Sequence, residues 1–390
     1  MAFDPAAALP GAPDPWAPSE MPVVRDGPPY AMTEMIAAEP ALAERLVGRL
    51  ATDPVLAYVA EAIRSAAEAA DPIVLTGCGT SEHAAMVAAV LIDEALRAAG
   101  QADPRVTSVQ ALELARRQQP AGMVLAISHE GGTWATNEAL RLSREAGMVT
   151  ALITVSDRSP AAQIAHLVLA TAEQDQSWCH TVGYLSPILA AAAICAELRS
   201  QPMEPAAIGD LLGEAPQEAA AEKTATTLAR VTRLLVVGSG VDYPIARELA
   251  LKVEEGAHLP ATALQLETIR HGHLAAADSE TGLVMVLTDA ESWGAPLVER
   301  SLAVLRSAHA LGMPAAALVA AGLDGEVPAS LSPAGRLIVA GSAELPGTVA
   351  AAVASAIPLQ LLAERLARVR GTNPDTIGRD DPRQAAAADA

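Results

Sequence analysis

The sequence predicts two tandem α/β domains, each built around a parallel sheet that helices cover on both faces. Short apolar runs alternate with helical segments of roughly 10–15 residues, as is typical of parallel sheets with crossover helices. Glycine turns recur 161 positions apart, at Gly77 and Gly238, and the strand ends at Ser128 and Thr288 lie 160 positions apart. This near-constant offset indicates a duplicated domain, and a length of 390 residues suits two domains of ordinary size.

The chain divides into three segments. Residues 1–27 are rich in Ala and Pro and show no apolar periodicity, so we expect a flexible lead-in without a fold. Residues 28–205 are expected to form the first domain, and residues 206–390 the second domain with a C-terminal tail. In α/β domains of this kind, ligands bind at the carboxyl ends of the strands.

Apolar periodicity and turn residues place the elements of each domain. In the first domain we expect helices at 32–50 and 55–70, a strand at 73–75, a glycine turn at 77–81 with a helix behind it, a strand at 123–127, a polar turn at 128–133, a helix to 145, and strands at 149–155 and 166–171. In the second we expect a strand at 234–237, a helix from 244, a strand at 283–287, a helix near 298–310, and strands at 315–319 and 337–340.

Composition excludes several classes of protein. No apolar run reaches the roughly 20 residues of a membrane-spanning helix, and the first residues lack a basic secretory start, so we expect a cytoplasmic protein with no membrane partner. Cys78, Cys179 and Cys195 show no CxxC spacing, which argues against disulfides and structural zinc. The net charge of −20 would repel a nucleic-acid backbone. We expect no metal, no other cofactor and no nucleic acid.

The first glycine turn, GCGTS at 77–81, is a candidate site for a small anion. Neither this turn nor the one at 238–240 completes the G-x-G-x-x-G pattern, which argues against a bound dinucleotide. The hydroxyls of Thr80 and Ser81 stand where a helix N-terminus presents free N–H groups to an anion. In the second domain the corresponding segment, residues 240–242, has no hydroxyl and carries the anionic Asp242, so we expect only the first domain to bind. A tight turn without a ligand is the alternative interpretation.

Five motifs in the same order resemble those of the sugar isomerase (SIS) domain family. They are GCGTS at 77–81, SHEGGT at 128–133 (family SQSGET), ALKVEEG at 250–256 (family ALKLKE), RHG at 270–272 (family K/R-H-G), and the segment 357–375 (family PLQLLAYYLAxxxGxNPD). The resemblance covers nearly all of residues 30–375. It is specific to the isomerase half of glutamine–fructose-6-phosphate aminotransferase and to related amino-sugar-phosphate isomerases and deaminases.

The resemblance implies two flavodoxin-like, three-layer α/β/α SIS domains, and it assigns three catalytic residues. Glu255 would move a proton between C1 and C2 of the sugar, and His271 would assist ring opening from the neighbouring subunit of a homodimer. Lys252 lies three positions from Glu255 on the same expected helix, so both side chains can face one pocket. The alternatives are an exposed ion-pair ladder through Glu248, and a structural histidine in the core or at a helix end.

The same resemblance implies a set of substrate-binding residues in the first domain and the C-terminal helix. They are Gly79, Thr80, Ser81, Ser128, His129, Glu130, Gly131, Thr133, Ser177 and Gln360. For Ser177 the alternative is a polar connecting loop, and for Gln360 it is a buried structural amide. Three features depart from the family: Glu130 replaces a serine, the family's C-terminal lysine has no counterpart, and no glutaminase half is present.

These motifs predict an enzyme that binds a small sugar or sugar phosphate. The expected activity is aldose–ketose isomerisation or deamination of a sugar phosphate, in particular of an amino-sugar phosphate, without a glutaminase domain. One alternative is a non-catalytic sugar-phosphate sensor. The other is an isomerase for a non-phosphorylated sugar derivative, because a carboxylate at Glu130 would repel a dianionic phosphate if it turned into the pocket.

Overall fold

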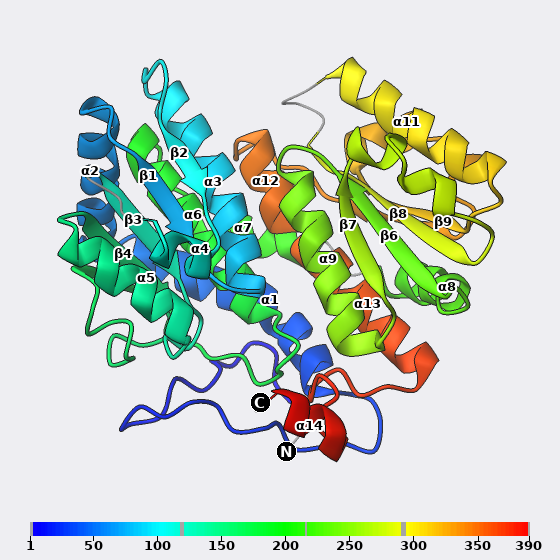
Figure 1. The fold of residues 1–390 in the computed structure, drawn as a ribbon, viewed down its shortest axis with the longest axis horizontal. Helices are drawn as coiled ribbons and strands as arrows, with labels where there is room; N and C mark the ends of the chain where they lie inside the picture. Colours follow the sequence, from blue (N-terminus) through cyan, green and yellow to red (C-terminus); the bar gives the residue numbers. More distant parts are fainter. Residues whose placement is uncertain (1–2, 118–120, 215–216, 290–293, 389–390) are drawn as a thin grey trace.

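Two five-stranded parallel sheets form the framework of the protein (Figure 1). A computed structural model describes residues 3–117, 121–214, 217–289 and 294–388. The first sheet contains β1 Ile73–Thr76, β2 Val106–Ser108, β3 Met123–Ile127, β4 Val149–Thr154 and β5 Leu167–Ala170. The second contains β6 Arg233–Gly238, β7 Ala261–Gln265, β8 Thr281–Leu287, β9 Ala315–Ala320 and β10 Gly335–Val339. The predicted fold class, two α/β domains with parallel sheets, is confirmed.

Both sheets have the same strand order when each is numbered from its own first strand. The first sheet runs β2-β1-β3-β4-β5, and the second runs β7-β6-β8-β9-β10. All neighbouring strands within the described residues pair in parallel. The strand order reverses between the first and third strand of each domain, and ligands of open α/β sheets bind at such a point. In the first domain this point lies between β1 and β3.

The sequence patterns missed one edge strand in each domain, the strand that follows the helix after the domain's first strand. Strand β2 has only three residues, and none of them is fully buried. Strand β7 reads ATALQ, and Leu264 is the one residue of it that is buried. An edge strand pairs on one side only and buries less surface, so it does not need the continuous apolar run that marks a central strand.

Helices cover both faces of each sheet. In the first domain they are α1 Ala31–Leu50, α2 Pro54–Glu68, α3 Thr80–Ala98, α4 Ala111–Ala115, α5 Trp134–Glu145, α6 Val182–Arg199 and α7 Pro205–Gly213. In the second they are α8 Glu218–Leu228, α9 Asp242–Ala257, α11 Ala295–Ala310, α12 Gly347–Ala354, α13 Ala356–Arg370 and α14 Pro382–Ala388. Short 3₁₀ helices are η1 Thr268–Arg270, η2 His273–Ala276, η3 Ala321–Glu326 and η4 Ala329–Leu331.

One hydrophobic core extends through both domains. Helices α3 and α6 pack together beside the first sheet, α9 and α13 pack together beside the second, and α3 contacts α9 across the domain boundary. The outer faces have separate clusters, with α4 and α5 on the first sheet and α11 on the second. Figure 1 shows α3, α9, α12 and α13 between the two sheets. This packing brings α9 of the second domain beside the loops of the first.

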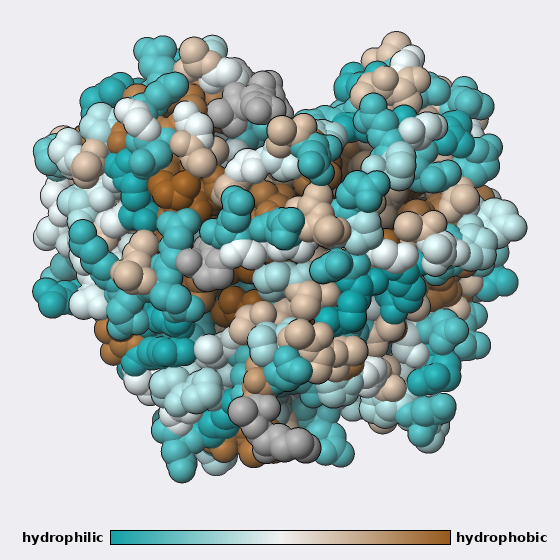
Figure 2. All heavy atoms as spheres, turned by 180° about the vertical axis from the view of Figure 1, so that it is seen from behind, coloured by the Kyte–Doolittle hydropathy of each residue, from teal (hydrophilic) through white to brown (hydrophobic). Residues whose placement is uncertain are grey.

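Two helical stretches are long and apolar enough to cross a membrane, but both lie inside the protein. In each stretch the most apolar 18-residue window is largely buried, to 83% in Val182–Arg199 and to 100% in Gly347–Arg370. Their apolar character is that of core helices, because each packs against neighbours on all sides. Figure 2 shows two lobes with a notch between them, and polar residues cover most of the face in view.

The lead-in forms no helix or strand within residues 3–27, but it lies against the first domain. The N–H of Gln174 donates to the carbonyl of Pro10 at 2.8 Å, and Nε1 of Trp16 donates to the carbonyl of Glu130 at 3.0 Å. Composition predicted a flexible lead-in, whereas these contacts hold its described residues against the loops at the carboxyl end of the first sheet. Gln174 and Glu130 lie more than 100 positions from the lead-in residues that they contact, so local sequence could not indicate these contacts.

Candidate active site

A cavity of about 640 Å³ opens at the carboxyl ends of β1 and β3, where the strand order reverses. This volume lies within the range of about 300–1,000 Å³ that is usual for small-molecule sites. Its walls come from the loops after β1, β3 and β5, from α9, from the lead-in and from the C-terminal tail. The lining residues are Trp16, Pro18, Ser19, Cys78, Gly79, Thr80, Ser81, His129, Glu130, Gly132, Thr133, Trp178, His180, Glu255, Ile377 and Arg379.

The glycine turn after β1 forms the first wall. Gly79 has φ of 57°, a left-handed conformation that favours glycine and lets the chain turn into α3. The hydroxyl of Thr80 donates to Oε1 of Glu248 at 3.1 Å and accepts from Nζ of Lys252 at 2.9 Å. The hydroxyl of Ser81 has no partner among the described residues. Ser81 is therefore free to meet a ligand at the helix N-terminus, whereas Thr80 is engaged within the protein.

The polar turn after β3 forms the second wall. Gly131 has φ of 75°, and a Cβ there would lie 2.2 Å from Oγ of Ser159, so only glycine fits. Ser128 and Gly131 are buried behind the wall and do not line the cavity. Thr133 does line it, and its hydroxyl caps no N–H of α5. The hydroxyl-bearing residues Ser81 and Thr133 thus line the same cavity, each at the N-terminus of a helix.

Helix α9 places a buried ion network beside the cavity. Lys252 is fully buried, with Nζ 3.0 Å from Oε1 of Glu248 and 2.9 Å from Oε2 of Glu255. Oε2 of Glu248 lies 2.7 Å from Nδ1 of His83 on α3. The network therefore joins α3 of the first domain to α9 of the second. The alternative of an exposed ion-pair ladder is wrong, because Glu248 and Lys252 are wholly enclosed at the domain boundary.

Lys252 and Glu248 are charged at neutral pH. Burial alone would lower the pKa of Lys252, but Glu248 and Glu255 outweigh it and hold that pKa well above its usual range. Burial alone would raise the pKa of Glu248, but Lys252, and after it His83, lowers it to about 2. Lys252 is therefore a fixed cation that orients Glu255, and it is not suited to release a proton.

Glu255 is the member of the network that reaches the cavity. Its side chain is 22% exposed, and Oε2 is held by Lys252. Within the described residues its other oxygen, Oε1, has no hydrogen-bond partner. Because one oxygen is anchored and the other is accessible, the carboxylate is oriented toward a ligand.

Glu130 lines the cavity, but its carboxylate is bound by the lead-in. The hydroxyl of Ser19 donates to Oε1 of Glu130, and the N–H of Ser19 donates to Oε2 at 3.3 Å. The same Ser19 hydroxyl accepts a hydrogen bond from Nε1 of Trp178 at 3.2 Å. The lead-in thus supplies the partners that hold this carboxylate toward the rim.

Ser19→Ala is expected to weaken the binding of inorganic phosphate by about one decade, because the freed Glu130 carboxylate can turn toward the anion. Glu130→Gln alone should change phosphate affinity by less than about threefold, since the Ser19 donors already hold the native carboxylate. The double variant should bind like the wild type. Calorimetric titration of the three variants measures this, and an unchanged affinity in Ser19→Ala would contradict the proposed restraint.

Comparisons with known proteins agree with this geometry. Residues 68–196 match the SIS domain family. These residues are similar to a SIS domain. The chain is 29% identical over 380 residues to glutamine–fructose-6-phosphate aminotransferase (isomerizing) of Symbiobacterium thermophilum, an alignment covering 92% of this chain. The chain spans about half the length of the curated relatives it matches, 59% in this case and 50% for the relative from Zymomonas mobilis.

Solved structures share the fold of both domains. The C-terminal domain of glucosamine-fructose-6-phosphate aminotransferase from Francisella tularensis aligns with a TM-score of 0.75 at 22% identity, covering 91% of this chain and 100% of that one. Tagatose-6-phosphate ketose/aldose isomerase from Escherichia coli aligns with a TM-score of 0.69 at 19% identity, covering 92% and 98%. Both comparisons span the two domains together.

Ser177 and Gln360 lie outside the cavity of the first domain. Ser177 is buried, and its N–H donates to Oδ1 of Asp175 at 3.0 Å. Gln360 is fully buried on α13, where Nε2 donates to Oε1 of Glu39 at 2.9 Å. Neither residue lines the cavity in which we expected it to contact a substrate. Gln360 fits the alternative interpretation, a buried structural amide.

His271 stands apart from the cavity of its own chain. It follows η1, its side chain is 73% exposed, and Nε2 lies 3.4 Å from Oε1 of Glu267. It is not among the lining residues. The alternative of a core histidine is therefore wrong, whereas the alternative of a histidine at a helix end fits its place after η1. A role in catalysis would require a second copy of the chain to bring His271 to the pocket.

Sequence reasoning missed Arg379, Trp178 and His180, which line the same cavity. The guanidinium of Arg379 lies over the ring of Trp178, 5.0 Å from its centroid. Arg379 follows the NPD segment, so the tail carries a cation where the sequence comparison found no counterpart of the family's lysine. Asp175 and His180 flank Ser177, and a polar stretch between β5 and α6 was the only local signal.

The second domain has a smaller cavity, of about 300 Å³, lined by Thr288 and Asp289 among others. Asp242 does not line it: its carboxylate is fully buried and accepts hydrogen bonds from the N–H and hydroxyl of Thr288. Burial, more than any other influence, raises the pKa of Asp242 to about 7. The carboxyl group of Asp242 is thus engaged within the protein and does not face this cavity.

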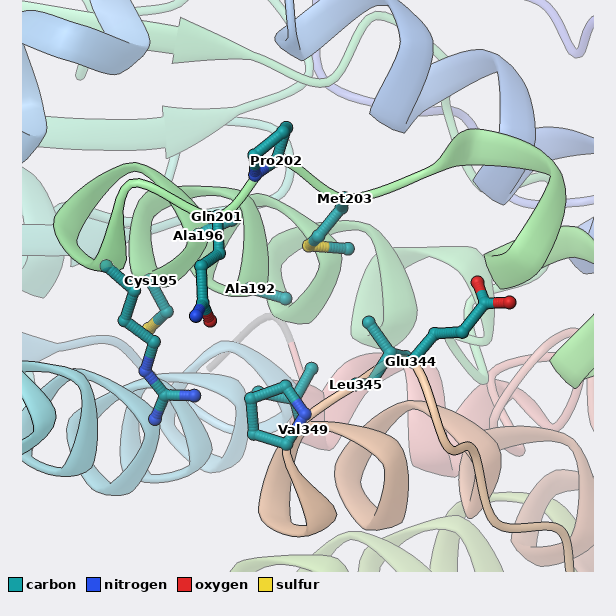
Figure 3. A pocket seen from close by; sticks show the side chains of 11 residues that line it. Ala192, Cys195, Ala196, Gln201, Pro202, Met203, Glu344, Leu345 and Val349 are labelled. Carbon is teal, nitrogen blue, oxygen red and sulfur yellow. The ribbon is translucent and has the colours of Figure 1, made fainter.

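A further cavity, between the end of α6 and the start of α12, is too small for a sugar. Its volume is about 50 Å³, which suits a few water molecules at most. Figure 3 shows Cys195, Met203 and Val349 among its lining side chains. Burial raises the pKa of Cys195 to about 12, so this thiol is unreactive at neutral pH.

Proposed function

We propose that this chain is a sugar-phosphate isomerase that acts on a hexose 6-phosphate or an amino-sugar phosphate. The observation that carries the proposal is the position of Glu255: an oriented carboxylate lines the same cavity as the hydroxyls of Ser81 and Thr133. The names of similar proteins support the substrate class, since they specify fructose 6-phosphate and tagatose 6-phosphate.

The proposed chemistry requires one base beside two adjacent carbons. Aldose–ketose isomerisation moves a hydrogen between C1 and C2 through an enediol. Oε1 of Glu255 would take the proton from one carbon and return it to the next, while Lys252 holds Oε2 at 2.9 Å. The fixed lysine prevents the carboxylate from rotating, so the same oxygen can serve both carbons.

The phosphate would bind at the helix N-termini of the SIS domain. First-turn N–H groups of α3 and α5 favour an anion, and the hydroxyls of Ser81 and Thr133 add donors. Arg379 supplies a cation on the opposite wall, and within the described residues it forms no ion pair with a carboxylate. These donors let a dianion bind locally although the whole chain carries a net charge of −20.

Hydrogen exchange in deuterated water tests the proposal. The protein is incubated with fructose 6-phosphate, tagatose 6-phosphate or glucosamine 6-phosphate, and proton NMR follows the signals at C1 and C2. We expect solvent deuterium at one of these carbons with at least one substrate, and ammonium in addition if the reaction is a deamination. Binding of all three without exchange would instead indicate a sugar-phosphate sensor.

We further propose that two copies of the chain pair and that His271 serves the partner's cavity. Mixing His271→Ala subunits with Glu255→Gln subunits should then restore a measurable part of the activity, because one of the two sites regains both native residues. The activity of refolded mixtures, compared with that of each variant alone, measures this. Mixed dimers that stay inactive would remove the cross-subunit role of His271.

A further inference from the structure

We propose that His180 is a second catalytic residue of the cavity, in which Nε2 exchanges a proton with the substrate's oxygen atoms and Asp175 positions the ring. This inference rests on the proposed function, because it assigns the proton donor that the isomerisation needs besides Glu255. His180 lines the cavity and belongs to the same chain, whereas His271 is exposed and stands outside it.

The ring of His180 has one buried edge and one accessible edge. Nδ1 is buried, lies 3.7 Å from Oδ2 of Asp175, and has no closer hydrogen-bond partner in the described part of the chain. The side chain is 27% exposed. Nε2 has no protein partner among the described residues, and it is less buried than Nδ1. The accessible nitrogen of a cavity-lining histidine is therefore free to bind a ligand.

Asp175 is a fixed anion at the start of α6. Its carboxylate accepts the N–H of Ser177 at 3.0 Å, that of Thr181 at 2.6 Å and that of Gly183 at 3.0 Å. Burial alone would raise the pKa of Asp175, but His180, and after it His129 and the N–H of Gly183, outweigh burial and lower this pKa to about 2. Three backbone donors hold the carboxylate in one orientation, so it can set the position of the neighbouring ring.

Gly183 makes room for the ring. A Cβ at Gly183 would lie 3.1–3.2 Å from Cγ, Cβ and Nδ1 of His180, so the ring packs directly on the first turn of α6. The ring of His129 lies on another side, with the two centroids 5.0 Å apart. The His180 ring is therefore held between α6 and the polar turn after β3, and it does not swing freely in the cavity.

The pKa values of the two histidines are shifted in opposite directions. Burial, and after it His180, lowers the pKa of His129 to about 3, and its Nε2 accepts the N–H of Asp175 at 3.0 Å, so His129 is neutral. Burial would also lower the pKa of His180, but Asp175 outweighs burial and raises it. Lys252 opposes this effect and Glu255 adds to it. His180 therefore keeps its proton to a higher pH than an ordinary histidine.

The proton transfers balance in the proposed step. Glu255 takes the proton from C2 while the imidazolium of His180 gives its Nε2 proton to the carbonyl oxygen on C1, which forms a neutral enediol. Neutral His180 then accepts the hydroxyl proton from the oxygen on C2 as Glu255 delivers its proton to C1. Both side chains end in their starting protonation states, and no other reactant is needed.

His180→Gln is the first test, with His309→Gln on the exposed side of α11 as the matched control. We expect the His180 variant to lose about 10²-fold in kcat with a small change in KM, as for loss of a general acid. The high-pH limb of the wild-type kcat profile should disappear. A variant with wild-type kcat would overturn the proposal for His180 and leave the proposed function intact.

Histidine NMR of the unmodified protein is the second test, and it does not depend on enzyme turnover. We expect the ring signals missing from His180→Gln to titrate above an ordinary histidine and to shift when fructose 6-phosphate is added. In Asp175→Asn, if it folds, the titration should move to lower pH. A pKa at or below the ordinary value, or no response to the sugar phosphate, would overturn the proposal even if no substrate turns over.

Discussion

Glu255→Gln is expected to lower the turnover number by about 10²–10⁴-fold, the range observed when a general base is lost. The amide keeps the size of the side chain and can still accept the hydrogen bond from Lys252, so the fold and the ligand affinity should persist. It cannot take a proton from carbon. Deuterium exchange at C1 and C2 should therefore fall in parallel with turnover, and NMR measures both in one sample.

Glu254→Gln is the matched control for this experiment. Glu254 is the neighbouring carboxylate on α9, but it is exposed and accepts the N–H of Ala261 at 3.1 Å. It does not line the cavity. We expect near wild-type turnover in this variant. Equal losses in the two variants, or full turnover in Glu255→Gln, would show that Glu255 is not the base.

Lys252→Met is expected to lower the free energy of unfolding by about 3–5 kcal/mol, because it leaves buried carboxylates without their cation. Glu248 is wholly buried, and after the substitution His83 is its only remaining ion-pair partner among the described residues. Replacing both partners, as in Lys252→Met with Glu248→Gln, should recover part of the loss. Urea unfolding of the single and double variants measures the coupling.

Lys223→Met is the matched control, since Lys223 and Lys252 are the only lysines of the chain. Lys223 is exposed on α8, and its loss should change stability by less than about 0.5 kcal/mol. If Lys252→Met is no less stable than this control, the network does not hold α3 and α9 together.

The wild-type network also predicts a pH dependence of stability. The pKa of Glu248 in the folded protein is about 2, below its ordinary value of 4.5. The stability it contributes is therefore complete above about pH 4.5 and is lost as the pH falls toward 2. Lys252→Met removes the partner that lowers this pKa most, so the unfolding free energy of the variant should fall less between pH 5 and pH 3 than that of the wild type.

Local sequence was sufficient for the central strands and for the two loops of the site. Strands β3 and β8 are largely apolar and fully buried, so the length of each apolar run identifies the strand without knowledge of the strands beside it. GCGTS and SHEGGT have fixed spacing after such strands, and parallel strands bring their carboxyl ends to one edge. The meeting of Ser81 and Thr133 at one cavity therefore follows from order along the chain.

The sequence by itself determined the two parallel sheets and the Glu255 position on a helix with Lys252. Only the tertiary structure decided which groups face a ligand. Thr80 is engaged by α9, Gln360 is enclosed by α1, and Glu130 is bound by Ser19 from the lead-in. These partners lie between 111 and 321 positions apart in sequence. Hydrogen bonds and burial depend on distance in space, so residue type and spacing cannot show whether a polar side chain is already satisfied.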